Sequence, residues 1–161
     1  MRFPLHIVAL ILLITAVTAC SNDSCSDNGN SLPLATFYVG NNQQSISTLS
    51  IMGIGVPGDS LLVDSMSVNE AYLPLRASTS TTSYALGRPS ADGKTSVSDT
   101  LTLEHKAVEY FHSIECGVMY NFDIHKVSYT THGIDSVVLL TPLVTNARTP
   151  ALRIHFTTLT P

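Results

Sequence analysis

The sequence predicts an all-β fold, an antiparallel β-sandwich of immunoglobulin-like or similar type, in a single domain. Apolar residues alternate with polar ones over 118–125, a period of two that a helix does not explain. Only 12% of the residues are charged, so the polar surface is drawn largely from Ser, Thr and Asn, as suits an exported β protein. Turn-forming residues recur about every ten residues, which favours about eight or nine strands.

The first half of the chain contains apolar runs separated by turn residues. Strands are expected at residues 34–39 and 46–52, in a third run at 60–63 that leads through Asp64-Ser65 into 67–75, and at 78–86. The polar turn between the first two runs predicts a hairpin-like arrangement. The third run is interrupted at Asp64-Ser65, and Pro74 near its end indicates a sheet edge or a bulge, because proline cannot donate to a strand ladder. Turns are expected at 87–89 and 91–94.

The second half continues the same pattern. Strands are expected at residues 97–105, 118–131, 134–141 and 152–157, with a turn at His132-Gly133. Residues 106–114 admit a strand or a single helical turn, and a strand is favoured because Tyr110 and Phe111 suit one. The alternation places four residues toward a core: Val118, Tyr120, Phe122 and Ile124. Leu101 and Leu103 share one strand face, and Leu152, Ile154 and Phe156 alternate with polar residues near the terminus.

The N-terminal residues resemble a bacterial lipoprotein signal. Arg2 supplies the positive end, residues 7–14 are apolar, and Val17-Thr18-Ala19-Cys20 resembles a lipobox, in which the cysteine is lipidated before the chain is cut ahead of it. We therefore expect residues 1–19 to be a signal peptide, 20–31 a flexible lipidated leader, and 32–161 the β-sandwich domain. A retained transmembrane helix, which takes roughly 18 or more apolar residues, and a secreted chain without lipid are the alternatives.

Acyl chains on Cys20 would hold the mature protein on a membrane. Each buried methylene contributes about 0.8 kcal/mol, and stable anchoring takes more than one chain. We expect a cell-envelope protein that is lipid-anchored to the outer membrane. Asp23 and Asp27 partly resemble a signal for passage to the outer cell surface in some Gram-negative bacteria, and the periplasmic and surface-exposed sides both stay open.

Two cysteines remain once Cys20 is assigned to lipid. Cys25 and Cys116 can pair in an oxidising periplasm, and we predict that disulfide. It would close a long loop and join the leader to the domain. The alternatives are two free thiols or a Cys/His metal site, although no CxxC or HxH spacing is present to favour metal.

Two groupings of residues contain the types found in catalytic sites. Asp123 and His125 lie two apart on a predicted outward face, as an acid/base pair or two metal ligands would, but a third partner is missing. A solvated strand face is the favoured interpretation. Asp135-Ser136 near His132 contains the residue types of a hydrolytic triad, but the serine lacks the GxSxG elbow, and a turn is favoured.

The remaining histidines show no ligand spacing. His105, His112 and His155 are scattered along the chain and are interpreted as surface or rim residues. We therefore predict no catalytic residue, no metal and no cofactor. The net charge of −4 and the lack of any Lys/Arg cluster also make nucleic acid an unfavourable partner.

Several longer motifs resemble one family. The segments YFHSIECG at 110–117, THGIDSV at 131–137 and LPL at 73–75 are similar to the DUF6452 group of small Bacteroidota lipoproteins of unknown function. The resemblance covers nearly the whole mature chain. It implies the same fold and location, and it implies an envelope partner such as an outer-membrane β-barrel protein.

A short triplet recurs along the chain. Asp, then Ser or Thr, then an aliphatic residue or Met is similar to the O-glycosylation sequon of these bacteria. It makes Ser60, Ser65, Thr100 and Ser136 candidate glycosylation sites. The alternative is local: Asp and Ser favour turns, and the apolar residue begins the next strand.

Two function classes fit these observations best. The first is a noncatalytic accessory lipoprotein that docks through a sheet face or edge onto another outer-membrane protein. The second is an extracellular module that binds glycan or another ligand, which the absence of Trp makes less favourable. An enzyme ranks third, because no convergent acid, base and nucleophile can be assembled.

Overall fold

The computed structural model describes residues 31–56, 60–90, 96–114 and 116–158, and this part of the chain contains eleven strands and no helix. The strands are β1 Leu34–Val39, β2 Asn42–Gln43, β3 Ile46–Ile54, β4 Leu61–Val68, β5 Glu70–Tyr72, β6 Thr81–Pro89, β7 Ser96–Ser113, β8 Gly117–Tyr129, β9 Ile134–Leu139, β10 Leu143–Val144 and β11 Pro150–Phe156. Within the described ranges, no helix is long and apolar enough to cross a membrane.

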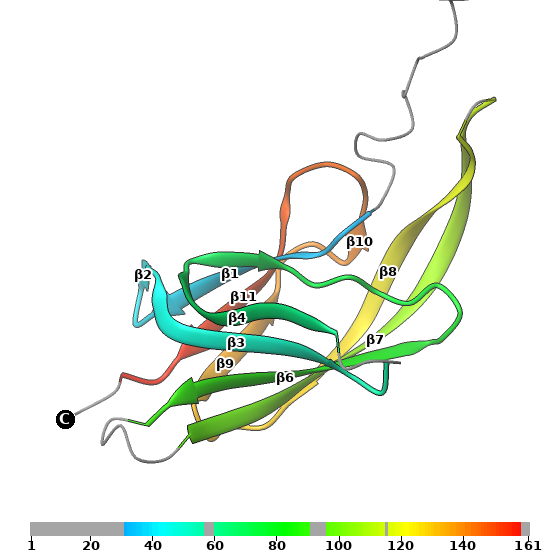
Figure 1. Cartoon of the computed structure of the whole chain (residues 1–161). Helices are drawn as coiled ribbons and strands as arrows, with labels where there is room; N and C mark the ends of the chain where they lie inside the picture. Colours follow the sequence, from blue (N-terminus) through cyan, green and yellow to red (C-terminus); the bar gives the residue numbers. More distant parts are fainter. Residues whose placement is uncertain (1–30, 57–59, 91–95, 115, 159–161) are drawn as a thin grey trace, which may run out of the picture.

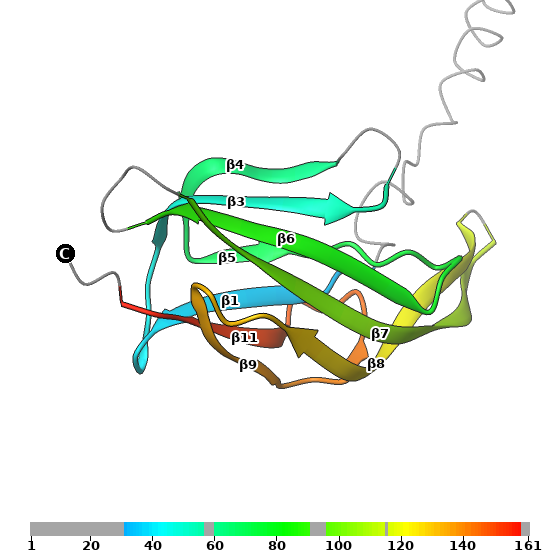
Figure 2. The same ribbon diagram turned by 90° about the horizontal axis from the view of Figure 1, so that it is seen from below.

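The strands form two sheets that pack face to face (Figure 2). The smaller sheet has the order β2-β1-β11-β9, with β5 also paired to β1, and the larger has the order β10-β8-β7-β6-β3-β4. All pairs are antiparallel except β1 with β11, which is parallel. The predicted β-sandwich is confirmed. The predicted strand count is too low because β2, β5 and β10 are two or three residues long, too short to show a period.

The core lies between the two sheets and follows the predicted alternation. Leu101 and Leu103 on β7 and Leu152, Ile154 and Phe156 on β11 are all buried. The ring of Phe156 meets that of Phe37 edge-to-face, with the centroids 5.7 Å apart. Each such fully buried side chain contributes about 1.5–3 kcal/mol relative to exposure, so this layer dominates the stability of the fold.

The predicted hairpin between 34–39 and 46–52 is wrong. Strand β1 lies in the smaller sheet and β3 in the larger sheet. The chain reverses at Gly40, whose φ of 58° favours glycine, and pairs β1 with the short β2. The polar segment therefore makes the tight hairpin itself and then crosses to the other sheet.

Two segments that were expected to interrupt strands lie within strands in the structure. Asp64 and Ser65 lie within β4, where Ser65 takes a φ of 48° and the pairing with β3 shifts register, so the break is a bulge rather than a turn. The expected turn at 87–89 is the end of β6, which pairs with β7 as far as Pro89. Arg88 is buried there and has backbone acceptors across the sandwich, which hold the segment extended.

The longest hairpin, β7–β8, extends beyond the sandwich (Figure 1). Strand β7 runs unbroken through 106–114 as far as Ser113, so the helical alternative is wrong. We define the arm as residues 106–114 and 116–121, beyond the last pairing of β7 with β6. Among the predicted core residues of β8, Phe122 and Ile124 are buried, but Val118 and Tyr120 are exposed, because they lie on the arm and no second sheet covers them.

Candidate functional site

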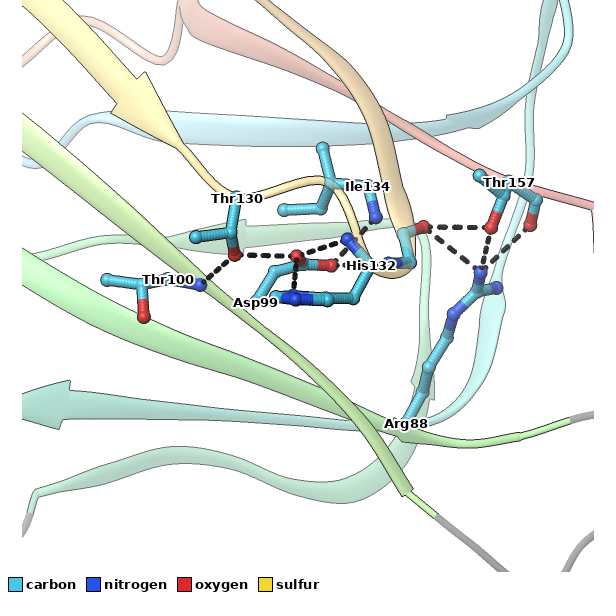
Figure 3. A network of polar contacts seen from close by, with 8 residues as sticks. Arg88, Asp99, Thr100, Thr130, His132, Ile134 and Thr157 are labelled. Atoms are coloured by element: carbon cyan, nitrogen blue, oxygen red, sulfur yellow. Dashed lines mark hydrogen bonds and ion pairs between the residues drawn. The ribbon is translucent and has the colours of Figure 1, made fainter.

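The most concentrated polar cluster surrounds Asp99, on the inward face of β7 (Figure 3). Asp99 is only 2% exposed. Its carboxylate accepts hydrogen bonds from the Thr130 hydroxyl at 2.7 Å and from three backbone amides, those of His132 at 2.7 Å, Gly133 at 2.6 Å and Ile134 at 2.8 Å. These donors belong to the loop that carries the chain from β8 in one sheet to β9 in the other.

The hydrogen bonds determine the charge state of Asp99. Burial by itself raises the pKa of this carboxyl, but the donors from Thr130, His132, Gly133 and Ile134 favour the charged form and together hold its pKa below the ordinary value. Asp99 is therefore ionised in the folded protein at neutral pH.

Arg88 holds the same loop from β6. Its Nη2 donates to the carbonyl oxygens of Gly133 at 3.0 Å and Thr157 at 2.9 Å, and to the Thr157 hydroxyl at 2.7 Å. The guanidinium carbon lies 5.3 Å from the centroid of the Phe156 ring. Burial lowers the pKa of Arg88, and the charge of Asp99 partly opposes that shift.

This Arg88–Asp99 cluster joins structural elements. Its donors and acceptors connect β6 and β7 of the larger sheet to the start of β9 and the end of β11 in the smaller one. Gly133 lies between them, where an added Cβ would come within 3.0 Å of Val97, 3.2 Å of Arg88 and 3.4 Å of Asp99. The hydrogen bonds of the cluster therefore link the two sheets, through the carboxylate of Asp99 and the Nη2 of Arg88.

The two candidate catalytic groupings are not assembled into sites. His132 contacts Asp99 through Nδ1 at 3.1 Å, whereas the Ser136 hydroxyl contacts Asp135 at 3.4 Å. Asp123 and His125 are both exposed on β8. Within the described ranges, no three His, Cys, Asp or Glu residues are grouped as a metal site would require.

The interpretation of His105 as a surface or rim residue is wrong. Its side chain is 1% exposed, because the alternation that buries Leu101 and Leu103 continues to it. Nε2 lies 2.8 Å from the Thr82 hydroxyl, and the ring meets Phe122 edge-to-face at 5.5 Å. Burial, with smaller contributions from His125 and Arg76, lowers its pKa. His112 is exposed and His155 half-buried, as expected.

The arm carries the largest concentration of exposed apolar side chains. Ile114 is 89% exposed, Phe111 67% and Val118 58%, and Val108 and Tyr120 are exposed as well. Phe111 and Val118 are cross-strand partners and so share one face of the hairpin. Soluble proteins rarely leave such a set uncovered without an interaction that uses it.

A groove of about 430 Å³ lies beside the arm. Its lining includes Val118, Tyr120 and Phe122 of β8, together with Leu32 and Leu75. The chain enters the domain here, where the Ser31 hydroxyl donates to Asn121 Oδ1 at 2.8 Å. The groove is thus apolar and lies next to the segment that leads back to the N-terminus.

Most of the remaining predicted sites lie in parts of the chain that the structure does not describe. Cys20, Cys25, the signal peptide and nearly all of the leader lie outside the described residues. Cys116 lies at the turn of the arm, where its backbone amide donates to the Ser113 hydroxyl at 3.1 Å.

The candidate glycosylation residues are placed differently. Ser60, Ser65 and Thr100 are exposed, and Ser136 is half-buried. Asp64, Asp99 and Asp135 of these triplets lie within β4, β7 and β9. The turn explanation is therefore wrong for these three.

Sequence reasoning missed Arg88 and Asp99. A signal existed for Asp99, since it lies two residues before Leu101 and shares the inward face of β7. The same kind of signal existed for Arg88, which lies two residues after the buried Leu86 on β6, but the acceptors of Arg88 lie far along the chain.

The comparisons with known proteins give one match. A family model described as "Family of unknown function (DUF6452)" matches residues 48–156. The matched range includes Arg88, Asp99, the β8–β9 loop and the whole arm, and it ends one residue before Thr157. No curated protein and no solved structure matches the chain.

Proposed function

Because the chain belongs to the DUF6452 family, a family of unknown function, we propose its function from its own surface. It is a noncatalytic accessory lipoprotein of the cell envelope, anchored through Cys20, that docks on another outer-membrane protein. The lipobox-like motif supports the anchor. The groove beside the arm supports the docking.

The observation that carries this proposal is the exposure of Val118 and Tyr120 at an apolar groove. Both side chains continue the inward-facing row of Phe122 and Ile124 but have no second sheet against them. A partner that presents an apolar segment would cover them as the missing sheet would. Clustered aromatic and aliphatic anchors of this kind supply most of the energy of protein interfaces.

The polar groups favour docking over chemistry. The buried charges, Arg88 and Asp99, hold the β8–β9 loop and the end of β11, and Asp99 is enclosed by donors of its own chain. A catalytic carboxylate needs access to a substrate proton or atom. Asp99 is 2% exposed and is occupied by structural hydrogen bonds.

Site-specific photo-cross-linking in intact cells tests the proposal. A photo-reactive amino acid replaces Tyr120, and the control carries it at Met66, a more exposed apolar residue on β4 at the edge of the same sheet. We expect one outer-membrane protein to be cross-linked in near-stoichiometric yield from position 120 and not from position 66.

Two outcomes would contradict the docking. Cross-linking of position 120 only to residues 21–30 of its own chain would show that the leader occupies the groove. The absence of any protein adduct, combined with retention of the purified protein on a glycan column, would support the ligand-binding alternative instead.

A further inference from the structure

We propose that the tip of the arm, at Phe111 and Ile114, contacts the lipid bilayer in which the protein is anchored. The inference rests on the proposed lipid anchor at Cys20 and on the predicted Cys25–Cys116 disulfide. It adds an orientation to the proposed function: the arm is the membrane-facing end of the domain, and the groove lies close to the bilayer.

The chemistry of the tip suits the interfacial region of a bilayer. Ile114 and Phe111 are the two most exposed large apolar side chains of the described residues, at 89% and 67%. Between Tyr110 and Met119 the sequence contains no Lys, Arg or Asp, and its ionisable residues are His112, Glu115 and Cys116. The attraction is therefore apolar, and it does not require anionic lipid.

The covalent chain brings this tip to the lipid. Cys25 follows the lipidated Cys20 by five residues, which span at most ~17 Å when fully extended. A disulfide to Cys116 would fasten the end of that short tether to the turn of the arm, directly beside Ile114. With that bond in place, the tip of the arm would be separated from the acyl chains by fewer residues than Ser31, where the described chain begins.

The disulfide is within reach of the described fold. Ser31 is bonded to Asn121, and the six residues from Cys25 to Ser31 span at most about 20 Å. Along β8, the five steps from Asn121 to Cys116 cover about 17 Å. The leader is therefore long enough to reach the arm tip while Ser31 keeps its place.

The other end of the molecule is built differently. Strand β7 begins at the end of the sandwich where β11 finishes and runs to the tip of the arm (Figure 1). Asp99 lies near the start of β7, and Arg88 donates to Thr157, which directly follows β11. That end is fastened by hydrogen bonds between the sheets, whereas the arm is a single uncovered hairpin. The apolar, uncovered end is the one that the tether holds at the membrane.

A tryptophan reporter tests the contact, because the sequence contains no Trp. Ile114→Trp is made in the full-length chain, which is processed in cells and reconstituted into phosphatidylcholine/phosphatidylethanolamine vesicles. We expect emission at shorter wavelength than in the lipid-free mature domain, and loss of emission when the acyl chains are brominated. The matched control Met66→Trp, on exposed β4, should show neither change.

The outcomes separate the premise from the inference. A product that fails to float with the vesicles contradicts the anchor and the proposed function with it. A product that floats but whose tryptophan emission from position 114 is unquenched overturns the tip contact alone, and it directs the search to a protein partner for the tip. Adding Cys116→Ser should reduce the quenching, and equal quenching without the cysteine would overturn the disulfide as its cause.

Discussion

Arg88 and Asp99 hold the peptide units on either side of Gly133 without contacting each other directly. Asp99 accepts from the Gly133 amide at 2.6 Å, and Arg88 donates to the Gly133 carbonyl at 3.0 Å. The loop between the sheets is therefore fixed by a negative group from β7 and a positive group from β6. Loss of Asp99 leaves the buried amides of Gly133 and Ile134 without their acceptor, which is costlier than loss of an exposed ion pair. The Gly133 carbonyl also accepts from the amide and the hydroxyl of Thr157, so it keeps partners when Arg88 is lost.

Replacement of Asp99 should destabilise the fold strongly and change its response to acid. In Asp99→Asn, one of the two accepting oxygens is replaced by an NH2 group, which cannot accept hydrogen bonds from the surrounding donors. We therefore expect a loss of about 2–3 kcal/mol in the free energy of unfolding at neutral pH. Because the folded-state pKa is lowered, the contribution of Asp99 is present above the ordinary pKa, about 3.9, and is lost as the pH falls through the folded value.

Urea unfolding between pH 3 and pH 7, a window of about one unit below the ordinary pKa of Asp to well above it, measures this effect. The difference between wild type and Asp99→Asn should shrink towards the acid end. Asp123→Asn, an exposed carboxyl on β8, is the control and should match wild type throughout. A constant difference at all pH values would contradict the assignment of the charge.

His105 should make stability pH-dependent in a separate window. Its pKa is lowered by burial, so the folded state keeps it neutral while the unfolded chain binds a proton below about pH 6.5. Its contribution is complete above that pH and is lost as the pH falls towards the folded pKa. His105→Gln should remove this part of the slope of unfolding free energy against pH, and His112→Gln, on the exposed arm, should retain it.

Gly133 should tolerate no side chain. An alanine Cβ would come within 3.0 Å of Val97 and 3.2 Å of Arg88, so we expect Gly133→Ala to cost about 1–3 kcal/mol, as overpacking does. Gly87→Ala on β6 is the matched control, because its Cβ meets no atom within 4 Å. Thermal unfolding of the two variants compares them directly, and equal midpoints would show that the β8–β9 loop relaxes freely.

The sequence predicted the class of fold because alternation over β8 and β11 is a local property. It could not predict that Val118 and Tyr120 are exposed, because a strand shows a period of two whether or not a second sheet covers it. The structural roles of Asp99 and Arg88 were not predicted for a related reason. Their hydrogen-bond partners, Gly133 and Thr157, lie far along the chain. The arm and the cluster thus depend on where the two sheets overlap, which no local pattern records.

Glycosylation at the Asp-Ser/Thr triplets should follow exposure. Ser60, Ser65 and Thr100 are exposed, whereas Ser136 is half-buried on β9. We expect protein purified from its native envelope to carry sugar at the first three and less at Ser136. Intact-mass measurement followed by peptide mapping checks this prediction. Unmodified peptides at all four residues would contradict glycosylation of these triplets.

The Cys25–Cys116 disulfide should stabilise the domain and fix the leader to the arm. In the chain-entropy model, closing a loop approaching 100 residues restricts the unfolded state by about 4–5 kcal/mol. Reduction, or Cys116→Ser, should therefore lower the unfolding free energy by up to that amount without altering the β-sheet signal in circular dichroism, because the arm projects beyond the core. Peptide mapping under non-reducing conditions should recover Cys25 joined to Cys116. Alkylation of both cysteines in the native, unreduced protein would contradict the bond and, with it, the placement of the arm at the membrane.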